Sequence, residues 1–210
     1  ETNKQIFLVN SRRNDKTSPS LVQCVDECNK ATCFVVSITT QLKSTRLRNG
    51  GEIQTLAEAL ETLPRARFNL DIKTRPAISP TIEAIETLQA HDRVLVSSFS
   101  NPIRKSALRG LSKPIATSGS LSTVLSAWLS HTLLFGAGFS AIVKDVHAFQ
   151  LPVRRGPVNF ATKSFIARAQ RHQTEVHFWT INDPEEMLRL LDLGADGIVS
   201  DRVDLFQTGN

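Results

Sequence analysis

The chain has 210 residues, 40% of them hydrophobic and 21% charged, which is enough to bury one sizeable core, so we expect a single globular domain over residues 1–210. No run approaches the ~18 consecutive apolar residues of a membrane span, and we expect neither a transmembrane segment nor an N-terminal signal peptide. The net charge of +5 favours anionic partners such as phosphates, a membrane surface or nucleic acid, unless the Lys and Arg side chains only solvate the surface.

Eight short apolar runs rich in Val, Ile and Phe predict strands, and helical patterns with a cap or a proline start lie between them. In chain order the prediction is strand 5–10, helix 19–30, strand 33–39, helix 55–63, strand 68–73, helix 80–90, strand 93–99, helix 102–110, strand 113–117, helix 121–131, strand 141–149, helix 162–172, strand 176–181, helix 184–193 and strand 197–200.

Strand and helix alternate along the whole chain, which favours right-handed crossovers and a parallel sheet. Eight strands of this kind predict an α/β fold that closes into a (β/α)8 TIM barrel. The competing architecture is an open doubly wound sheet, which carries a glycine-rich phosphate turn after its first strand. Residues 11–14, Ser-Arg-Arg-Asn, stand there instead and disfavour it.

The three cysteines are an odd set that fits neither a disulfide framework nor a zinc-ligand spacing. Cys24 and Cys28 lie four residues apart on a predicted helix, and Cys33 lies in the next strand. We expect free thiols, which favour a cytoplasmic location, although an organellar or exported form stays open.

Polar residues gather where the last predicted strands end. Thr180 and Asn182 follow one strand, Asp183 can cap the next helix, Gly194 can end it, and Asp201 follows the final strand. A parallel α/β barrel keeps its chemistry at the carboxyl ends of its strands. The arrangement therefore predicts a site at this edge, although for Asp201 a capping role is preferred.

Several blocks of the chain resemble the glycerophosphodiester phosphodiesterases. The C-terminal ones are residues 150–153 (Gln-Leu-Pro-Val), 165–171 (Phe-Ile-Ala-Arg-Ala-Gln-Arg), 176–182 (Val-His-Phe-Trp-Thr-Ile-Asn) and 196–202 (Asp-Gly-Ile-Val-Ser-Asp-Arg), and the upstream ones are 55–64, 68–73 and 94–99. The resemblance implies a TIM barrel of the phospholipase-C-like type. It also implies an enzyme that uses Ca²⁺ or Mg²⁺ to hydrolyse glycerophosphodiesters into glycerol 3-phosphate and an alcohol.

The N-terminal part departs from the motifs of this family. Ser-Arg-Arg at residues 11–13 stands at the His-Arg-Gly motif, and Ser-Pro-Ser at 18–20 stands at Glu-Asn-Thr. Ser37 and Thr39 replace the paired carboxylates of Glu-x-Asp. The segment with the family's second histidine is missing, and no histidine precedes His91.

These losses bear on catalysis. Mg²⁺ and Ca²⁺ prefer anionic oxygen ligands, so a site reduced to Asp71 loses most of its charge compensation. Each missing acid-base group is worth ~10²–10⁴-fold in rate. We therefore expect no catalytic residues, Asp71 as the single metal ligand and at most weakly bound Mg²⁺ or Ca²⁺. The expected function is a pseudoenzyme that binds a phosphate-bearing small molecule or glycerophosphodiester, or that acts as an interaction module. The alternative is an active metal-dependent phosphodiesterase with a rearranged site.

The resemblance also implies ligand-binding residues. Arg12 stands at the motif arginine, and Lys73 follows Asp71 by two residues on the same strand face, so both would reach the barrel mouth. A buried Asp71–Lys73 ion pair that satisfies only itself is equally open. The expected ligand-binding residues are Arg12, Lys73, Ser98, Trp179 and Asn182.

Each of the last three residues has an alternative role. Ser98 matches a Ser-Phe pair at a strand end and can serve as a cap. Trp179 and Asn182 match a Trp-Thr-x-Asn block that implies a pocket wall, while core packing is the alternative for Trp179. His147 and His177 lie in predicted strands and receive no role.

The sequence bears on three classes of binding partner. A nucleic-acid partner is disfavoured, because no helix presents an uninterrupted basic face. The short connection at residues 40–51 leaves one side of the barrel mouth uncovered, which favours a protein partner or a homo-oligomer. Arg154 and Arg155 are expected in an exposed loop on the rim, where an anionic ligand would approach.

Overall fold

The computed structural model describes residues 5–8, 32–34, 55–202 and 205. The chain divides into two compact units, one formed by Glu1–Leu8 with Ala116–Asn210 and the other by Val9–Ile115. We call them unit 1 and unit 2. The predicted helix at 19–30 lies outside the described residues. The single domain over residues 1–210 stays a prediction.

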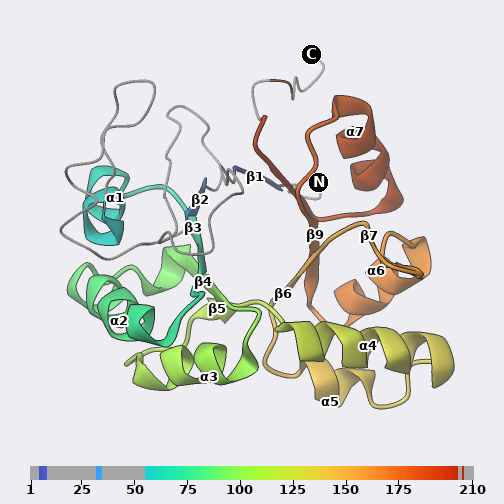
Figure 1. The fold of residues 1–210 in the computed structure, drawn as a ribbon, viewed down its shortest axis with the longest axis horizontal. Helices are drawn as coiled ribbons and strands as arrows, with labels where there is room; N and C mark the ends of the chain where they lie inside the picture. The colour runs from blue at the N-terminus through green and yellow to red at the C-terminus, as the bar shows by residue number, and fades with distance from the viewer. Residues whose placement is uncertain (1–4, 9–31, 35–54, 203–204, 206–210) are drawn as a thin grey trace. The chain divides into compact units, whose positions relative to one another are not determined.

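Unit 1 is built on a parallel sheet in the strand order β1, β10, β9, β6 (Figure 1). These strands are β1 (Gln5–Leu8), β6 (Ala148–Leu151), β9 (Glu175–Phe178) and β10 (Gly197–Ser200). The first strand of the chain therefore pairs with the last, in a parallel register that runs from Gln5↔Gly197 to Leu8↔Ser200. A closed parallel barrel requires this pairing, whereas an open doubly wound sheet places its first strand between other strands.

The remaining elements of unit 1 connect and cover this sheet. The short strand β5 (Ala116–Thr117) precedes Ser118, which forms a parallel bridge to Ala148 of β6. The helices are α4 (Leu121–Leu133), α5 (Phe139–Val143), α6 (Lys163–Arg171) and α7 (Pro184–Leu193). α7 begins as predicted, with Pro184 in its first turn and Asp183 accepting a hydrogen bond from the backbone N–H of Glu185.

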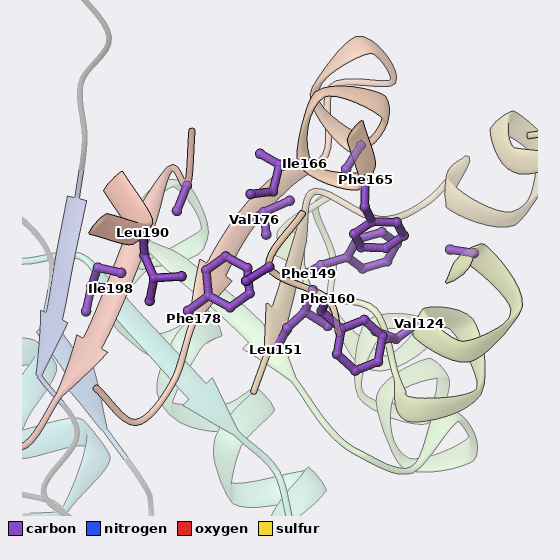
Figure 2. Close-up of a cluster of buried hydrophobic side chains, with 14 of the residues drawn as sticks. Val124, Phe149, Leu151, Phe160, Phe165, Ile166, Val176, Phe178, Leu190 and Ile198 are labelled. Atoms are coloured by element: carbon purple, nitrogen blue, oxygen red, sulfur yellow. The ribbon is translucent and has the colours of Figure 1, made fainter. Parts of the chain in front are cut away.

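One hydrophobic core holds the helices of unit 1 on the sheet (Figure 2). Side chains alternate between the two faces of a strand, so Phe149 and Leu151 of β6 and Phe178 of β9 lie on the same face of the sheet. Phe165 of α6 stacks on Phe149, with 6.0 Å between ring centroids and 11° between ring planes. The opposite face of these strands is left for other residues, Gln150 and His177 among them.

Unit 2 repeats the same plan with the parallel strands β2 (Thr32–Phe34), β3 (Phe68–Asp71) and β4 (Val94–Ser97) in this order. Its helices are α1 (Leu56–Thr62), α2 (Ile78–Thr87) and α3 (Asn101–Gly110), with two short 3₁₀ turns at Arg75–Ala77 and His91–Arg93. A second core contains Phe68, Leu70 and Val96 from the strands, with Leu60 and Ile85 from the helices.

The end of α1 is held by an arginine from a distant part of the sequence. The Arg93 guanidinium donates to the carbonyl oxygens of Leu60 at 2.7 Å and Leu63 at 3.1 Å, both at the C-terminus of the helix. It also lies over the Phe68 ring, 5.4 Å from its centroid. A cation at this end satisfies carbonyl groups that have no partner within the helix.

Two local predictions are wrong. The predicted strand 141–149 is the helix α5 (Phe139–Val143) followed by β6, because Phe139 and Val143, four residues apart, are both buried on one helical face. The predicted loop at Arg154 and Arg155 is exposed as expected, but it forms a hairpin of β7 (Arg154–Arg155) and β8 (Val158–Asn159). Gly156, at a φ of 58°, supplies the left-handed turn residue.

Within the described part of the chain, no helix is long and apolar enough to cross a bilayer.

Candidate functional site

In unit 2, candidate site residues lie where β3 and β4 end. Alternation turns Asn69 and Asp71 away from the core that holds Phe68 and Leu70, and Asp71 lies directly opposite Ser97 of β4. This edge is the carboxyl end of the strands, where the sequence predicts the site.

Asp71 and Lys73 form an ion pair at this edge. The Lys73 Nζ lies 2.9 Å from the Asp71 Oδ2, and the side chains are 48% and 20% exposed. The Nζ is also 5.9 Å from the centroid of the exposed Phe99 ring. The pair forms, but it is not the buried pair that one of the two alternatives describes, because both residues lie at the solvent-facing end of the strand. An exposed pair is weak and can exchange partners.

Ser98 follows this pair in the chain, but its hydroxyl proton already forms a hydrogen bond within the protein. Its Oγ donates to the carbonyl oxygen of Ile72 at 2.7 Å and accepts from the backbone N–H of Ser100 at 3.2 Å. The side chain is buried. This geometry is that of a strand-end cap, and it leaves a ligand only the second lone pair of the oxygen.

The described residues do not fit a divalent cation at Asp71. Among them no three His, Cys, Asp or Glu side chains lie close enough together to hold a metal ion. The Asp71 oxygen that contacts Lys73 already faces a positive charge, which a metal would have to displace. Ser37, Thr39 and the ligand candidate Arg12 lie outside the described residues.

In unit 1, a separate set of candidate residues lies where β9 and β10 end. The Asn182 Oδ1 accepts from the backbone N–H of Asp201 at 2.9 Å and from the Ser200 Oγ at 3.1 Å. The Asn182 Nδ2 donates to the Asp201 Oδ2 at 3.5 Å. Asn182 therefore fixes the two strand ends to each other and holds the Asp201 carboxylate in a defined position.

Trp179 follows β9 directly. Its backbone N–H donates to the carbonyl oxygen of Leu151 at 2.9 Å, which extends the sheet ladder by one residue. Alternation places its half-buried side chain on the face opposite Phe178, away from the core. This position favours the pocket wall over core packing.

The two strand histidines have local hydrogen bonds. The His177 Nε2 lies 2.9 Å from the Glu175 Oε2, and the His147 Nδ1 accepts from the backbone N–H of Thr117 at 3.2 Å. Their geometry calls for no acid-base role.

Sequence reasoning missed Gln150 of β6, a polar residue on the sheet face opposite the core. Gln150 pairs with His177 across the β6–β9 ladder, and its Nε2 is buried with no hydrogen-bond partner in the described part of the structure. The alternation of Gln150 with Phe149 and Leu151 is the signal that could have found it.

Known proteins resemble the chain in sequence. The model of the Glycerophosphoryl diester phosphodiesterase family matches residues 11–205. A Mycobacterium tuberculosis protein named "Probable glycerophosphodiester phosphodiesterase 2" is 38% identical over 167 residues, which cover 79% of this chain and 63% of that protein's length.

Solved structures resemble the chain in fold. A Parabacteroides distasonis glycerophosphodiester phosphodiesterase has a TM-score of 0.61 at 18% identity, covering 83% of this chain and 80% of its own. One from Thermotoga maritima has a TM-score of 0.52 at 15% identity, covering 83% of each chain. These likenesses support the (β/α)8 TIM-barrel fold predicted from the sequence and agree with the pairing of β1 with β10.

Proposed function

The chain belongs to the glycerophosphoryl diester phosphodiesterase family, and from this premise we propose that it binds a phosphate-bearing ligand and is impaired in hydrolysis. The ligand would be a glycerophosphodiester or a related small phosphate. We further propose a cytoplasmic location, no nucleic-acid ligand, and a protein partner or a second copy as an additional binding partner.

The observation that carries this proposal is the Asp71–Lys73 ion pair. Phosphodiester hydrolysis needs charge stabilisation at the phosphate oxygens and proton transfer to the leaving group. The Lys73 ammonium, 2.9 Å away, competes with a divalent cation for the Asp71 oxygen, and the described residues supply no group of three His, Cys, Asp or Glu side chains that would favour the metal. The sequence adds that no histidine precedes His91, so an early imidazole acid or base is missing.

The same pair supplies a means of binding phosphate. Lys73 is 48% exposed, so its ammonium can turn from Asp71 to an incoming anion at little cost. We propose Lys73 and Arg12 as the phosphate contacts, with the second lone pair of Ser98 as an additional acceptor. In unit 1 we propose Trp179 and Asn182 as ligand-binding residues.

An active metal-dependent phosphodiesterase is the second candidate function. It is favoured by the 38% identity to a relative whose name states this activity. In that case carboxylates other than Asp71 would have to complete a metal site, and the activity would depend on added Mg²⁺ or Ca²⁺.

The substitution Asp71→Asn separates the two candidates, because it has opposite consequences for them. It removes the negative charge that neutralises Lys73, so the ligand-binding proposal expects tighter binding of sn-glycerol 3-phosphate, measured by calorimetry. An active enzyme would instead release glycerol 3-phosphate from glycerophosphocholine with Mg²⁺ or Ca²⁺ and would lose this activity in the variant.

Lys73→Met tests the binding residue directly. We expect it to abolish the rise in melting temperature that sn-glycerol 3-phosphate causes in the unsubstituted protein. Lys105→Met is the matched control, since Lys105 is an exposed lysine on α3 of the same unit. Metal-dependent hydrolysis by the unsubstituted protein, or equal effects of the two lysine variants, would refute the proposal.

A further inference from the structure

Helix α4 of unit 1 exposes a row of large apolar side chains. Leu125, Leu129 and Leu133 recur every four residues and therefore lie along one side of the helix, and all three are exposed. The opposite side of α4 contributes Val124 and Ala127 to the core. α4 is thus apolar on both its buried and its exposed sides, which a helix bathed only in water rarely is.

The row continues into the turn after α4. Leu133, Leu134 and Phe135 are 68%, 58% and 89% exposed, so three consecutive large apolar residues stand in solvent. We call Leu125, Leu129, Leu133, Leu134 and Phe135 together the α4 apolar patch. Residues 121–143, which contain this patch, include no Asp, Glu, Lys or Arg.

The turn is held firmly in this exposed position. The backbone N–H groups of Leu134 and Gly136 both donate to the carbonyl oxygen of Ser130, at 3.2 and 2.7 Å, and the buried Ser130 Oγ donates to the carbonyl oxygen of Ala137 at 2.8 Å. Phe135 has a φ of 51°, in the left-handed region that favours glycine or asparagine. A phenylalanine that is both exposed and left-handed does not serve the stability of the turn, which points to another role.

Arginines of α6 lie near one end of the patch. The Arg168 guanidinium lies against Gly136, where any added Cβ would collide with it. Its Nε donates to the His131 Nδ1 of α4 at 2.9 Å. Burial, together with the nearby charges of Arg168 and Arg171, lowers the pKa of His131. No carboxylate of the described residues pairs with Arg168 or Arg171.

The sequence around the patch also has a net positive charge. Residues 116–174 contain six Lys or Arg side chains against the single acidic residue Asp145, so this segment alone accounts for the net charge of +5 of the whole chain. An uncharged apolar surface bordered by cations is complementary to a bilayer, which offers apolar chains beneath anionic headgroups.

We propose that the α4 apolar patch docks the protein onto the surface of an anionic lipid bilayer, with Phe135 and its neighbours inserted between headgroups and with Arg168 and Arg171 facing the lipid phosphates. A second copy of the chain is a poorer occupant. In a two-fold symmetric dimer each patch would meet its own image, which would bring the arginines of the two copies together. This proposal does not depend on the proposed function of the barrel mouth.

The test is sedimentation of the purified protein with vesicles of phosphatidylcholine mixed with an equal amount of phosphatidylglycerol, compared with phosphatidylcholine alone. The protein should bind the anionic vesicles more tightly, and added salt should weaken this binding. Phe135→Asn should lower the partition coefficient about tenfold, the effect of removing one inserted phenylalanine. Because asparagine accepts a left-handed φ, the same substitution should leave the melting temperature equal or higher.

The matched control is Leu188→Asn, which replaces an apolar residue on α7 that is 52% exposed and lies outside the patch. It should leave vesicle binding unchanged. The proposal is overturned if the unsubstituted protein does not bind anionic vesicles, or if Phe135→Asn and Leu188→Asn bind equally well. It is also overturned if the protein is a dimer that Phe135→Asn dissociates without any effect on vesicle binding.

Discussion

Removal of the Arg93 guanidinium should release the C-terminal end of α1. Arg93→Met keeps most of the aliphatic side chain and removes the donors to the carbonyl oxygens of Leu60 at 2.7 Å and Leu63 at 3.1 Å. It also removes the cation that lies 5.4 Å from the centroid of the Phe68 ring. The helix end would then have to find water or lose its last turn.

The size of the effect follows from these contacts. A hydrogen bond to a charged donor contributes about 1.5–3 kcal/mol, and an exposed cation–π contact contributes about 0.5–1 kcal/mol. Arg93 is only half-buried, so its bonds belong at the low end of this range. Burial lowers the pKa of Arg93, because removal from water disfavours the charged guanidinium, and this cost offsets part of the hydrogen-bond energy. We therefore expect a loss of about 2 kcal/mol.

Urea unfolding measures the loss in the free energy of unfolding. Hydrogen exchange of the backbone amides shows whether the loss is confined to α1. The α1 amides should exchange faster in Arg93→Met, while those of α4 keep their protection. Arg67→Met is the control, because Arg67 is an exposed arginine of the same unit and should change stability by less than about 0.5 kcal/mol. If the two variants are equally stable, the guanidinium does not hold the helix and the reasoning is wrong.

Two further predictions concern stability. Hydrogen bonds from the backbone and side chain of Ser112, and then from His91, lower the pKa of Glu86 to about 2. A lowered carboxyl pKa stabilises the fold above its ordinary value near 4.5, so stability should fall between about pH 4.5 and pH 2, and Glu86→Gln should flatten this dependence in unfolding curves recorded across that range. Phe165→Ala should cost about 3–5 kcal/mol in urea unfolding, since Phe165 is fully buried and stacks on Phe149. Phe135→Ala, at an exposed site, should leave stability nearly unchanged, and equal losses in both variants would contradict the core assignment.

Much of the barrel can be predicted from the sequence, because the residues that begin and end its helices act locally. The cap at Asp183, the proline at position 184 and the glycine at position 194 set the bounds of α7 without reference to the rest of the chain. The predicted strand 141–149 is wrong because the local signal is ambiguous there. A short apolar run fits a buried helix as well as a strand until the burial of Phe139 and Val143 is known.

The candidate site is less predictable from sequence. The spacing of Asp71 and Lys73 places both on one face of β3, but their exposure depends on where the strand ends in the folded unit. Alternation in the sequence can place Gln150 on the face opposite the core, but its position beside His177 follows only from the register of β6 and β9. The leucines of α4 resemble core positions in the sequence, and only the packing of Val124 and Ala127 on the other side shows that they face solvent.

The pairing of β1 with β10 has a consequence for biosynthesis. Unit 2 is continuous in sequence, so all its residues have left the ribosome before most of unit 1 has been translated. β1 is made long before its partner β10, because the whole of unit 2 and most of unit 1 lie between them in the sequence. Until β10 has been made, the edge of β1 that pairs with it stays unpaired and is available to chaperones or to a neighbouring nascent chain.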